Sequence, residues 1–397
     1  MPRRRGEEQE TIGKCAGRSR ASGQNAEPGL GDATREAFRP GPFPVSVTMH
    51  HLKVLFALTA ASALVACGGG GDDSPAPAPT PTPAPTPGPA PSPGVGTNGT
   101  LQTSVAPASY PGDTRRLNAF NQLDAARLGA GAGLLAQSAA LDSSAQSHAN
   151  YLTANGFNSA DSAHDETSGL ADFTGANPFV RMQNAGYNYS FATEVIGDIG
   201  SASSTSDCVG DLLDTVYHAA SMLSRVTDVG FGFGTGTAAG MSTIDMGSPL
   251  NGGDAKQIPP SGAVVAYPFN GSTVAHGTFH VSSESPRVSK ALLPNATAGT
   301  PILVGFRNQD VMDGGTVTIT QFSVATSGGT AVPAVIVADP AVVGSNVNAD
   351  SELNSAFAVL VPVSPLAAGT YVVTLHATIS GGQALALSTW SFTVAAP

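Results

Sequence analysis

Between residues 110 and 251, apolar residues recur at intervals of three and four, which places their side chains on one face of an α-helix. This pattern predicts helices over residues 116–128, 134–155, 179–184 and 207–224. A glycine-rich connector, residues 129–133, separates the first two helices. Asp142 and Ser143 are candidate caps for the second part of the second helix.

Shorter runs that are rich in β-branched and aromatic residues lie between and after these helices. They predict strands over residues 191–199, 229–233 and 241–246. Because helices and strands alternate here, we expect residues 110–251 to form one α/β domain.

The pattern changes from residue 259 onward. Short runs of Val, Thr, Ile and Phe, separated by clusters of Gly, Pro, Asn and Asp, predict strands and no helix. The strands are expected over residues 263–267, 302–306, 316–324, 335–338, 356–363, 371–379 and 390–394. The stretch LAAGTYVVTL, residues 366–375, resembles the turn and strand of bacterial immunoglobulin-like domains. We therefore expect residues 259–397 to form an immunoglobulin-like antiparallel β-sandwich, an architecture that does not itself specify a function.

The N-terminal part contains one apolar run. Met49 begins a short basic stretch, which is followed by the apolar residues 54–66 and ends in small residues before Cys67. This arrangement is typical of a secretory signal, and the run is too short to cross a bilayer core of about 30 Å. We interpret residues 49–66 as a signal peptide. Translation is then expected to start at Met49, and residues 1–48 to be a non-native or disordered extension.

The end of this signal, Leu64-Val65-Ala66-Cys67, resembles the lipobox of bacterial lipoproteins. The resemblance implies cleavage before Cys67, lipidation of its side chain, and anchoring in the outer membrane or at the cell surface. Ordinary secretion, with Cys67 as an incidental residue, is the alternative. Residues 67–109 are rich in Gly and Pro, and the alternating prolines of 75–93 predict a semi-rigid polyproline II tether behind the anchor.

Charge and cysteine content exclude several classes of protein. The net charge is −11, and from Cys67 onward acidic residues outnumber basic ones by 23 to 9, which argues against a nucleic-acid partner. Three cysteines are too few for a disulfide-dense scaffold. Cys208 is expected to be a small buried residue. No Gly-x-Ser-x-Gly, His-Glu-x-x-His or P-loop motif is present.

Several polar residues of the α/β domain are candidates for chemistry. Asp211, Asp214 and His218 share one face of the predicted helix 207–224, so that Asp214 can orient the ring of His218. A solvated polar face is the alternative. Glu194 lies in an apolar run, where a carboxylate either faces solvent or is buried and paired. His164 follows a polar loop, and a histidine in a loop does not by itself indicate a functional site.

The order of these residues resembles the bacterial branch of the CAP superfamily, the cysteine-rich secretory, antigen 5 and pathogenesis-related 1 proteins, also called SCP-like. The motifs that carry the resemblance are His164, Arg181, Gly186-Tyr187, Glu194, His218-Ala-Ala-Ser-Met-Leu and Gly230-Phe-Gly. Together they cover about residues 112–248. Each motif is short, but the ordered set is specific.

The resemblance implies an α-β-α sandwich whose cleft carries two histidines and two acids that can hold a divalent metal. Carried over by position, the histidines are His164 and His218 and the first acid is Glu194. The second acid position holds Thr215, and Asp214 or Asp211 is a candidate substitute. The resemblance thus implies a ligand site of His164, Glu194, His218 and Asp214. The first three are candidate ligands of Zn²⁺ or another divalent cation, and no residue is assigned a catalytic role.

Three functions follow from these features. The first is binding of a small apolar or glycan-like ligand at the cell surface by a membrane-anchored protein, with the sandwich presenting the cleft. The second is a metal-dependent hydrolase that acts on peptide or envelope material. The third is an adhesive or structural protein with a vestigial cleft.

Overall fold

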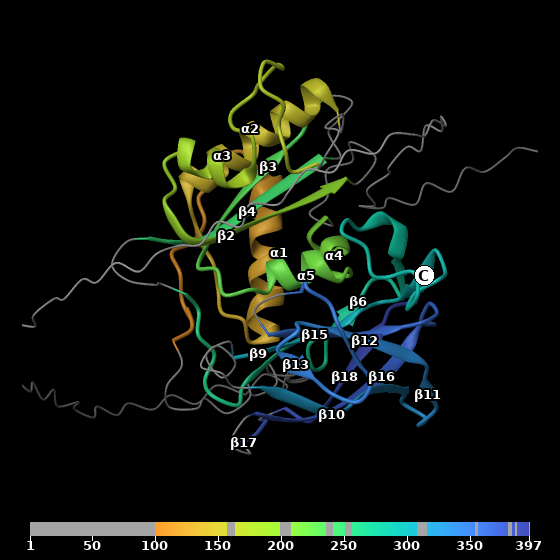
Figure 1. Ribbon diagram of the computed structural model, residues 1–397. Helices are drawn as coiled ribbons and strands as arrows, with labels where there is room; N and C mark the ends of the chain where they lie inside the picture. Colours follow the sequence, from red (N-terminus) through yellow and green to blue (C-terminus); the bar gives the residue numbers. More distant parts are fainter. Residues whose placement is uncertain are drawn as a thin grey trace, which may run out of the picture. The chain divides into compact units, whose positions relative to one another are not determined.

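The structure, a computed structural model, describes residues 100–156, 163–198, 208–235, 241–250, 256–307, 316–353, 356–379, 383–385 and 387–396 (Figure 1). The predicted extension 1–48, the signal peptide 49–66, Cys67 and the tether up to residue 99 lie outside the described residues. Within the described residues, no helix is both long and apolar enough to cross a membrane.

The region that begins near residue 110 combines helices with a mixed four-stranded sheet. The described helices are α1 (Thr114–Ala130), α2 (Ala139–Asn155), α3 (Pro178–Asn184), α4 (Cys208–Leu213) and α5 (Tyr217–Met222). The strands are β1 (Ala136–Gln137), β2 (Tyr189–Asp198), β3 (Asp228–Phe233) and β4 (Met241–Pro249). The sheet order is β1-β3-β4-β2, with β1 parallel to β3 and the other pairs antiparallel. The three longer strands match the predicted ones.

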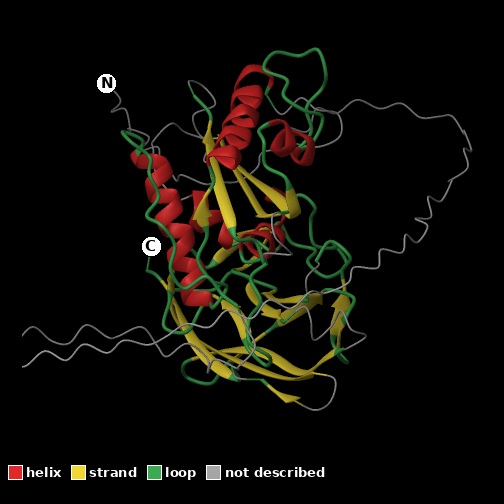
Figure 2. Ribbon diagram, turned by 90° about the vertical axis from the view of Figure 1, so that its left-hand side faces the viewer, coloured by secondary structure: helices red, strands yellow, loops and turns green. Residues whose placement is uncertain are grey.

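Helices cover both faces of this sheet. One face carries α2 and α3, and the other carries α1, α4 and α5 (Figures 1 and 2). Helix α2 lies directly on β3 because β3 has glycines where the two backbones meet. A Cβ atom on Gly230 would be 2.1 Å from the amide nitrogen of Asp142, and one on Gly232 would be 2.2 Å from the carbonyl carbon of Ala145. The Gly-Phe-Gly motif therefore serves the close packing of α2 on the sheet.

The second helix begins later than predicted. Residues 136–137 pair with β3 as strand β1, so the helix starts at Ala139, and Ser138 caps it by accepting a hydrogen bond from the amide of Leu141. Asp142 is therefore not a cap. Its Oδ1 accepts hydrogen bonds of 2.9 Å from the hydroxyl of Tyr110 and the amide of Phe231, which tie α2 to the sheet.

The prediction of a single helix over residues 207–224 is also wrong. The chain makes two short helices, α4 and α5, with residues 214–216 between them. Cys208, at the start of α4, is fully buried, in agreement with the prediction.

The C-terminal region is rich in β-structure. Two larger sheets have the orders β11-β10-β16-β18-β6 and β14-β12-β15-β9-β5; β13 and β17 join the first at β10 and β16, and β7 and β8 form a separate pair. Their bounds are β5 (Val264–Tyr267), β6 (Thr273–Val274), β7 (Thr278–His280), β8 (Thr297–Gly299), β9 (Ile302–Phe306), β10 (Val317–Thr326), β11 (Ala331–Val332), β12 (Ala334–Ala338), β13 (Val342–Val343), β14 (Val347–Ala349), β15 (Phe357–Pro362), β16 (Gly369–Ile379), β17 (Gln383–Ala384) and β18 (Thr389–Val394).

The seven predicted strands of this region correspond to β5, β9, β10, β12, β15, β16 and β18. The strands that the sequence pattern missed have only two or three residues, too few for alternation to show. The sheets are mixed rather than purely antiparallel, because β13, β14 and β6 pair in parallel with β10, β12 and β18. Buried residues of both larger sheets, such as Phe322, Trp390 and Val359, belong to one hydrophobic core.

The folded part of the chain begins before residue 110. Thr100 exchanges two backbone hydrogen bonds with Ile258, of 2.8 and 2.9 Å. The side-chain amide of Gln102 donates to the carbonyl oxygens of Leu134 and Thr227. Residues 100–109, which the sequence pattern places in the tether, thus contact the α/β region and the start of the C-terminal region.

Candidate functional site

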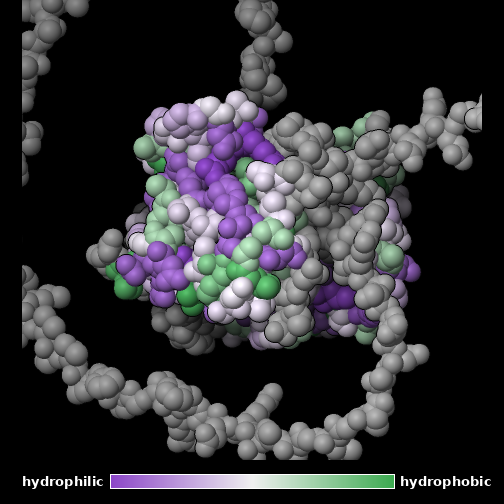
Figure 3. All heavy atoms as spheres, turned by 90° about the horizontal axis from the view of Figure 1, so that it is seen from above, coloured by the Kyte–Doolittle hydropathy of each residue, from purple (hydrophilic) through white to green (hydrophobic). Residues whose placement is uncertain are grey.

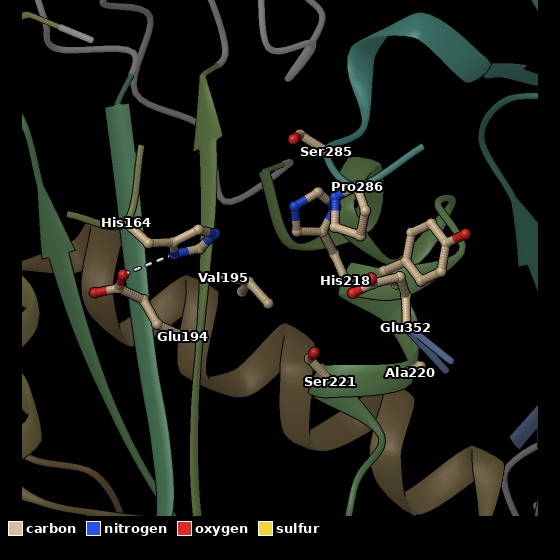
Figure 4. Close-up of a pocket in the computed structure, with 10 residues that line it drawn as sticks. His164, Glu194, Val195, His218, Ala220, Ser221, Ser285, Pro286 and Glu352 are labelled. Carbon is tan, nitrogen blue, oxygen red and sulfur yellow. Dashed lines mark hydrogen bonds and ion pairs between the residues drawn. The ribbon is translucent and has the colours of Figure 1, made fainter. Parts of the chain in front are cut away.

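A pocket of about 140 Å³ lies where the α/β region meets the C-terminal region (Figure 4). It is lined by His164, Glu194, Val195, Tyr217, His218, Ala220, Ser221, Ser285, Pro286 and Glu352. Three of the four predicted ligand-binding residues, His164, Glu194 and His218, are therefore brought together here. Figure 4 shows the rings of the two histidines on opposite sides of the pocket.

His164 is held by a buried carboxylate from β2. Its Nδ1 lies 2.8 Å from Oε1 of Glu194. Arg181, from α3, donates from Nη2 to both oxygens of Glu194, at 2.9 and 2.7 Å. Its Nη1 also donates to the backbone carbonyl of His164, at 2.8 Å. One guanidinium thus fixes both the carboxylate that orients the ring and the backbone that carries it.

A second buried pair lies behind this one. Glu166 accepts hydrogen bonds from the amides of Thr174 and Gly175, and its Oε1 lies 3.6 Å from Nε of Arg181. Fully buried His148 places Nδ1 2.9 Å from Glu166 and Nε2 2.9 Å from the carbonyl oxygen of Ala163. Both ring nitrogens face acceptors, so only the doubly protonated ring of His148 satisfies both.

These contacts explain the ionisation of Glu194. Burial by itself would raise its pKa, but the hydrogen bond with His164 and the positive charges of His148 and Arg181 outweigh burial and lower the pKa to about 2. The pKa of Glu166 is also lowered, since its hydrogen bonds and Arg181 outweigh the effect of burial. Two carboxylates thus balance the charges of Arg181 and His148 beneath the pocket.

His218 is oriented from α5. Its Nδ1 lies 3.1 Å from Oγ1 of Thr215, whose hydroxyl hydrogen is already donated to the carbonyl of Leu212, at 2.7 Å. The Thr215 oxygen must therefore accept from Nδ1, which carries the proton. The same holds for Nδ1 of His164, which faces the ionised Glu194. In the neutral state of both rings the lone pair is therefore on Nε2.

Asp214 is placed elsewhere. It lies in the break between α4 and α5, is only 7% exposed, and does not line the pocket. Burial and the charge of Asp211 raise its pKa well above the usual range, and its own charge acts on Tyr267 of β5. Because the predicted helix is broken, the shared helix face that linked Asp214 to His218 does not form.

The pocket residues include side chains of the kinds that bind metal ions. Among the described residues, no group of three His, Cys, Asp or Glu side chains is placed to hold a metal ion. Both oxygens of Glu194 are engaged by Arg181, and Oε1 also by His164, so this carboxylate orients His164. The pocket lining also includes Glu352, but within the described residues this carboxylate and the two imidazoles are not placed as a group that could hold one ion, whereas zinc sites use three or four protein ligands.

A further carboxyl lies directly opposite Glu194 in the sheet, and its titration gives a test of this electrostatic picture. Asp245 of β4 pairs with Glu194 of β2 and is fully buried. Burial and the Glu194 charge raise the pKa of Asp245 well above 3.8. The native state therefore keeps this proton while the unfolded state releases it, so this group lowers stability as the pH rises above about 4.

We expect Asp245→Asn to change the free energy of unfolding little near pH 4 and to stabilise the protein increasingly toward neutral pH. The asparagine removes the carboxyl that must stay protonated. Urea denaturation over this pH range measures the effect, with Asp172→Asn, at an exposed residue, as the control. A gain that does not grow with pH would contradict the assignment of a neutral Asp245.

The residues missed by the sequence analysis come from the C-terminal region. Ser285, Pro286 and Glu352 line the pocket, and Glu284 contacts His218 from behind. They lie in loops without periodicity, more than 60 residues from His218 in the sequence. No local pattern could have indicated them.

Comparison with known proteins identifies a family for the first of the two regions, the α/β region. Residues 118–244 match the CAP family, described as the cysteine-rich secretory protein family, and thus form a CAP (SCP-like) domain. This span lies within the resemblance drawn from the sequence motifs. No curated protein matches the chain.

Among solved structures, the chain is similar to an extracellular protein containing an SCP domain from Bacillus anthracis str. Ames, with 18% identity and a TM-score of 0.28. The match covers 34% of this chain and 40% of that one, so it spans less than half of that protein. CopC from Methylosinus trichosporium OB3b and PcoC, a copper resistance protein from Escherichia coli, are each 18% identical, with TM-scores of 0.19. They match 33% and 32% of this chain, and 88% and 94% of their own chains.

Proposed function

We propose that the CAP domain of this chain binds a small polar ligand in the pocket between His164 and His218. The observation that supports this is the fixed orientation of the two rings. Each Nδ1 is held by an acceptor, and the ring of His164 is held by a buried network of balanced charges. Side chains fixed in this way bind a ligand without first paying the entropy of ordering.

The lining favours a glycan-like ligand over an apolar one. Most of the lining side chains are polar, namely His164, Glu194, Tyr217, His218, Ser221, Ser285 and Glu352. The volume of about 140 Å³ is close to that of a cavity of about 150 Å³ that accommodates benzene. Because benzene has six heavy atoms and a hexose has twelve, the pocket encloses part of a single sugar residue, such as one edge of its ring.

The wider setting of this function follows from the sequence. We propose that the chain is secreted and that lipidated Cys67 anchors it to the bacterial envelope, with the Pro-rich tether holding the pocket away from the membrane. The C-terminal region, which we propose is an immunoglobulin-like sandwich, presents the pocket. Strands β10 and β12, one from each larger sheet, are in contact, and buried residues of both sheets belong to one hydrophobic core that also includes residues of the CAP domain.

We expect a hexose to bind the full-length protein with a dissociation constant in the millimolar range, because only part of the ring enters the pocket and makes few contacts. Binding of D-glucose, D-glucosamine and D-glucuronate is measured by saturation-transfer NMR and calorimetry. The double variant His164→Ala/His218→Ala should bind all three at least about tenfold more weakly, since it removes two hydrogen bonds that contribute about 1 kcal/mol each.

The alternatives give different results in the same experiment. No hexose binding, or binding that survives the double substitution, would remove the pocket as a ligand site and favour an adhesive protein with a vestigial cleft. A Zn²⁺ titration tests the metal-dependent hydrolase. Micromolar or tighter binding that the double variant abolishes would favour the hydrolase hypothesis. Hydrolase assays on peptide and envelope substrates would then be the next step.

A further inference from the structure

We propose that the C-terminal β region is part of the binding site, and that Glu352 makes the composite pocket prefer a ligand that carries a positive charge. This inference rests on the proposed function, because it concerns the same pocket. It adds residues of the C-terminal region to the site, whereas the motifs that carry the CAP resemblance all lie in the CAP domain.

Glu284 supplies the first argument. This residue follows the short 3-10 turn 281–283, and its side chain is fully buried against the start of α5. Its carboxylate accepts hydrogen bonds from three consecutive amides, those of Val216, Tyr217 and His218, at 3.0, 2.5 and 3.1 Å. Oε1 also lies 3.3 Å from Nδ1 of His218. A side chain of the C-terminal region thus positions both the helix that carries His218 and the ring itself.

A second contact fixes the loop that carries Glu352. The hydroxyl of Tyr217, the first residue of α5, donates to Oδ2 of Asp350 at 2.7 Å. The other oxygen of Asp350 accepts from the amide of Glu352 at 3.0 Å. Tyr217 also lines the pocket. Because one aspartate joins α5 to the backbone of Glu352, this residue is held at the pocket by the CAP domain.

The charges around the pocket give the ligand class. Its lining residues include two carboxylates, Glu194 and Glu352, and no lysine or arginine. Arg181 balances the charge of Glu194 from below. Glu352 therefore contributes a negative charge that no lining cation balances, beside the rings of two histidines. A donor-rich, positively charged group, such as the ammonium of an amino sugar, matches this arrangement.

Three hexoses of similar size and different charge test the preference at about pH 7. We expect the full-length protein to bind D-glucosamine, a cation, about fivefold more tightly than neutral D-glucose, and anionic D-glucuronate most weakly. Glu352→Gln should remove this order. Asp172→Asn, which removes an exposed carboxylate outside the pocket lining, should leave the order intact.

The role of Glu284 is tested by the tautomer of His218, which ¹⁵N NMR of the imidazole rings reports. The native ring should carry its proton on Nδ1. In Glu284→Ala, Nδ1 keeps only the Thr215 acceptor, and the start of α5 loses three hydrogen bonds to Glu284, so we expect the Nδ1-protonated fraction to fall. Glu284→Gln, which keeps an acceptor oxygen, should restore much of that fraction. The tautomer of His164 should not change in either variant, and Trp390 fluorescence confirms that the C-terminal region stays folded. If Glu284→Ala does not fold, Thr215→Val tests the same point, because Glu284 alone must then keep the proton of the His218 ring on Nδ1. Loss of the Nδ1 proton in Thr215→Val would overturn the role of Glu284.

The outcomes separate this inference from the proposed function. Hexose binding that depends on His164 and His218 but keeps its charge order in Glu352→Gln would overturn the inference alone. An unchanged His218 tautomer in Glu284→Ala would likewise overturn the role of Glu284. Absence of binding by any hexose would overturn the proposed function and the charge preference together.

Discussion

Arg127→Met will destabilise the CAP domain by about 3–5 kcal/mol, because it removes the partner of several buried groups at once. The side chain of Arg127 is completely buried and donates five hydrogen bonds to backbone carbonyls. The acceptors are the carbonyl oxygens of Ala132, Gly133, Met222, Ser224 and Val226. This guanidinium joins the end of α1 to the segment that follows α5, and methionine fills its volume without donating a hydrogen bond.

Denaturation followed with two probes measures this effect and locates it. Every α-helix of the described residues lies in the CAP domain, so the helical circular dichroism signal reports on that domain. Trp390 is the only tryptophan and lies in β18, so its fluorescence reports on the C-terminal region. We expect the helical transition to shift strongly. Arg116→Met, at a partly exposed arginine of α1, should cost less than about 1 kcal/mol. Equal costs for both variants would contradict the argument.

Arg181→Met is the second large effect, again about 3–5 kcal/mol at neutral pH. Arg181 is the guanidinium between Glu166 and Glu194, both of which are buried. Its removal leaves two buried carboxylates with only His148 as a positive partner. Arg181→Lys keeps the charge but cannot reproduce the forked hydrogen bonds, so we expect an intermediate loss.

The pH dependence shows whether charge or volume causes this loss. In the native protein Glu194 has a depressed pKa, so its contribution to stability is present above about pH 4.5 and is lost as the pH falls toward 2. Without Arg181 the carboxylates take up protons at higher pH, which relieves the penalty. The difference between Arg181→Met and the native protein should therefore shrink from pH 6 to about pH 3. A difference that stays constant would indicate a packing defect.

The two arginines also separate stability from ligand binding. Arg127 lies away from the pocket lining, whereas Arg181 holds both Glu194 and the backbone of His164. Where both variants are studied under conditions in which they remain folded, only the change at Arg181 should weaken hexose binding. The buried platform beneath the pocket would then have a role in binding beyond its role in folding.

The sequence pattern located most of the regular structure because that structure depends on local spacing. The strands of the CAP sheet and the longer strands of the C-terminal region carry enough residues for alternation or apolar runs to appear. The prediction was wrong where a distant group decided the outcome. Residues 136–137 are a strand because they pair with β3, and the helix at 207–224 is broken where Glu284 binds the amides that begin α5.

The candidate site shows the same contrast between what local patterns predict and what distant contacts decide. The order and spacing of His164, Glu194 and His218 were enough to select these residues, because each stands in a motif of its own. Their relation to one another was not contained in those motifs. That Glu194 is bound to Arg181, that His148 holds Glu166, and that both imidazoles keep a proton on Nδ1 are consequences of contacts between separate elements.

By itself, the sequence determined the CAP motifs, the β-rich C-terminal half, the acidic charge and the candidate histidines, since each of these is a property of residues close together in the chain. Only the tertiary structure decided that Asp214 lies away from the pocket and that Glu284 and Glu352 lie beside it. The physical reason is that hydrogen bonds and burial join groups 66 to 133 residues apart, such as Glu284 with His218 and Asp350 with Tyr217. A local pattern contains no record of which distant partner a polar group will find.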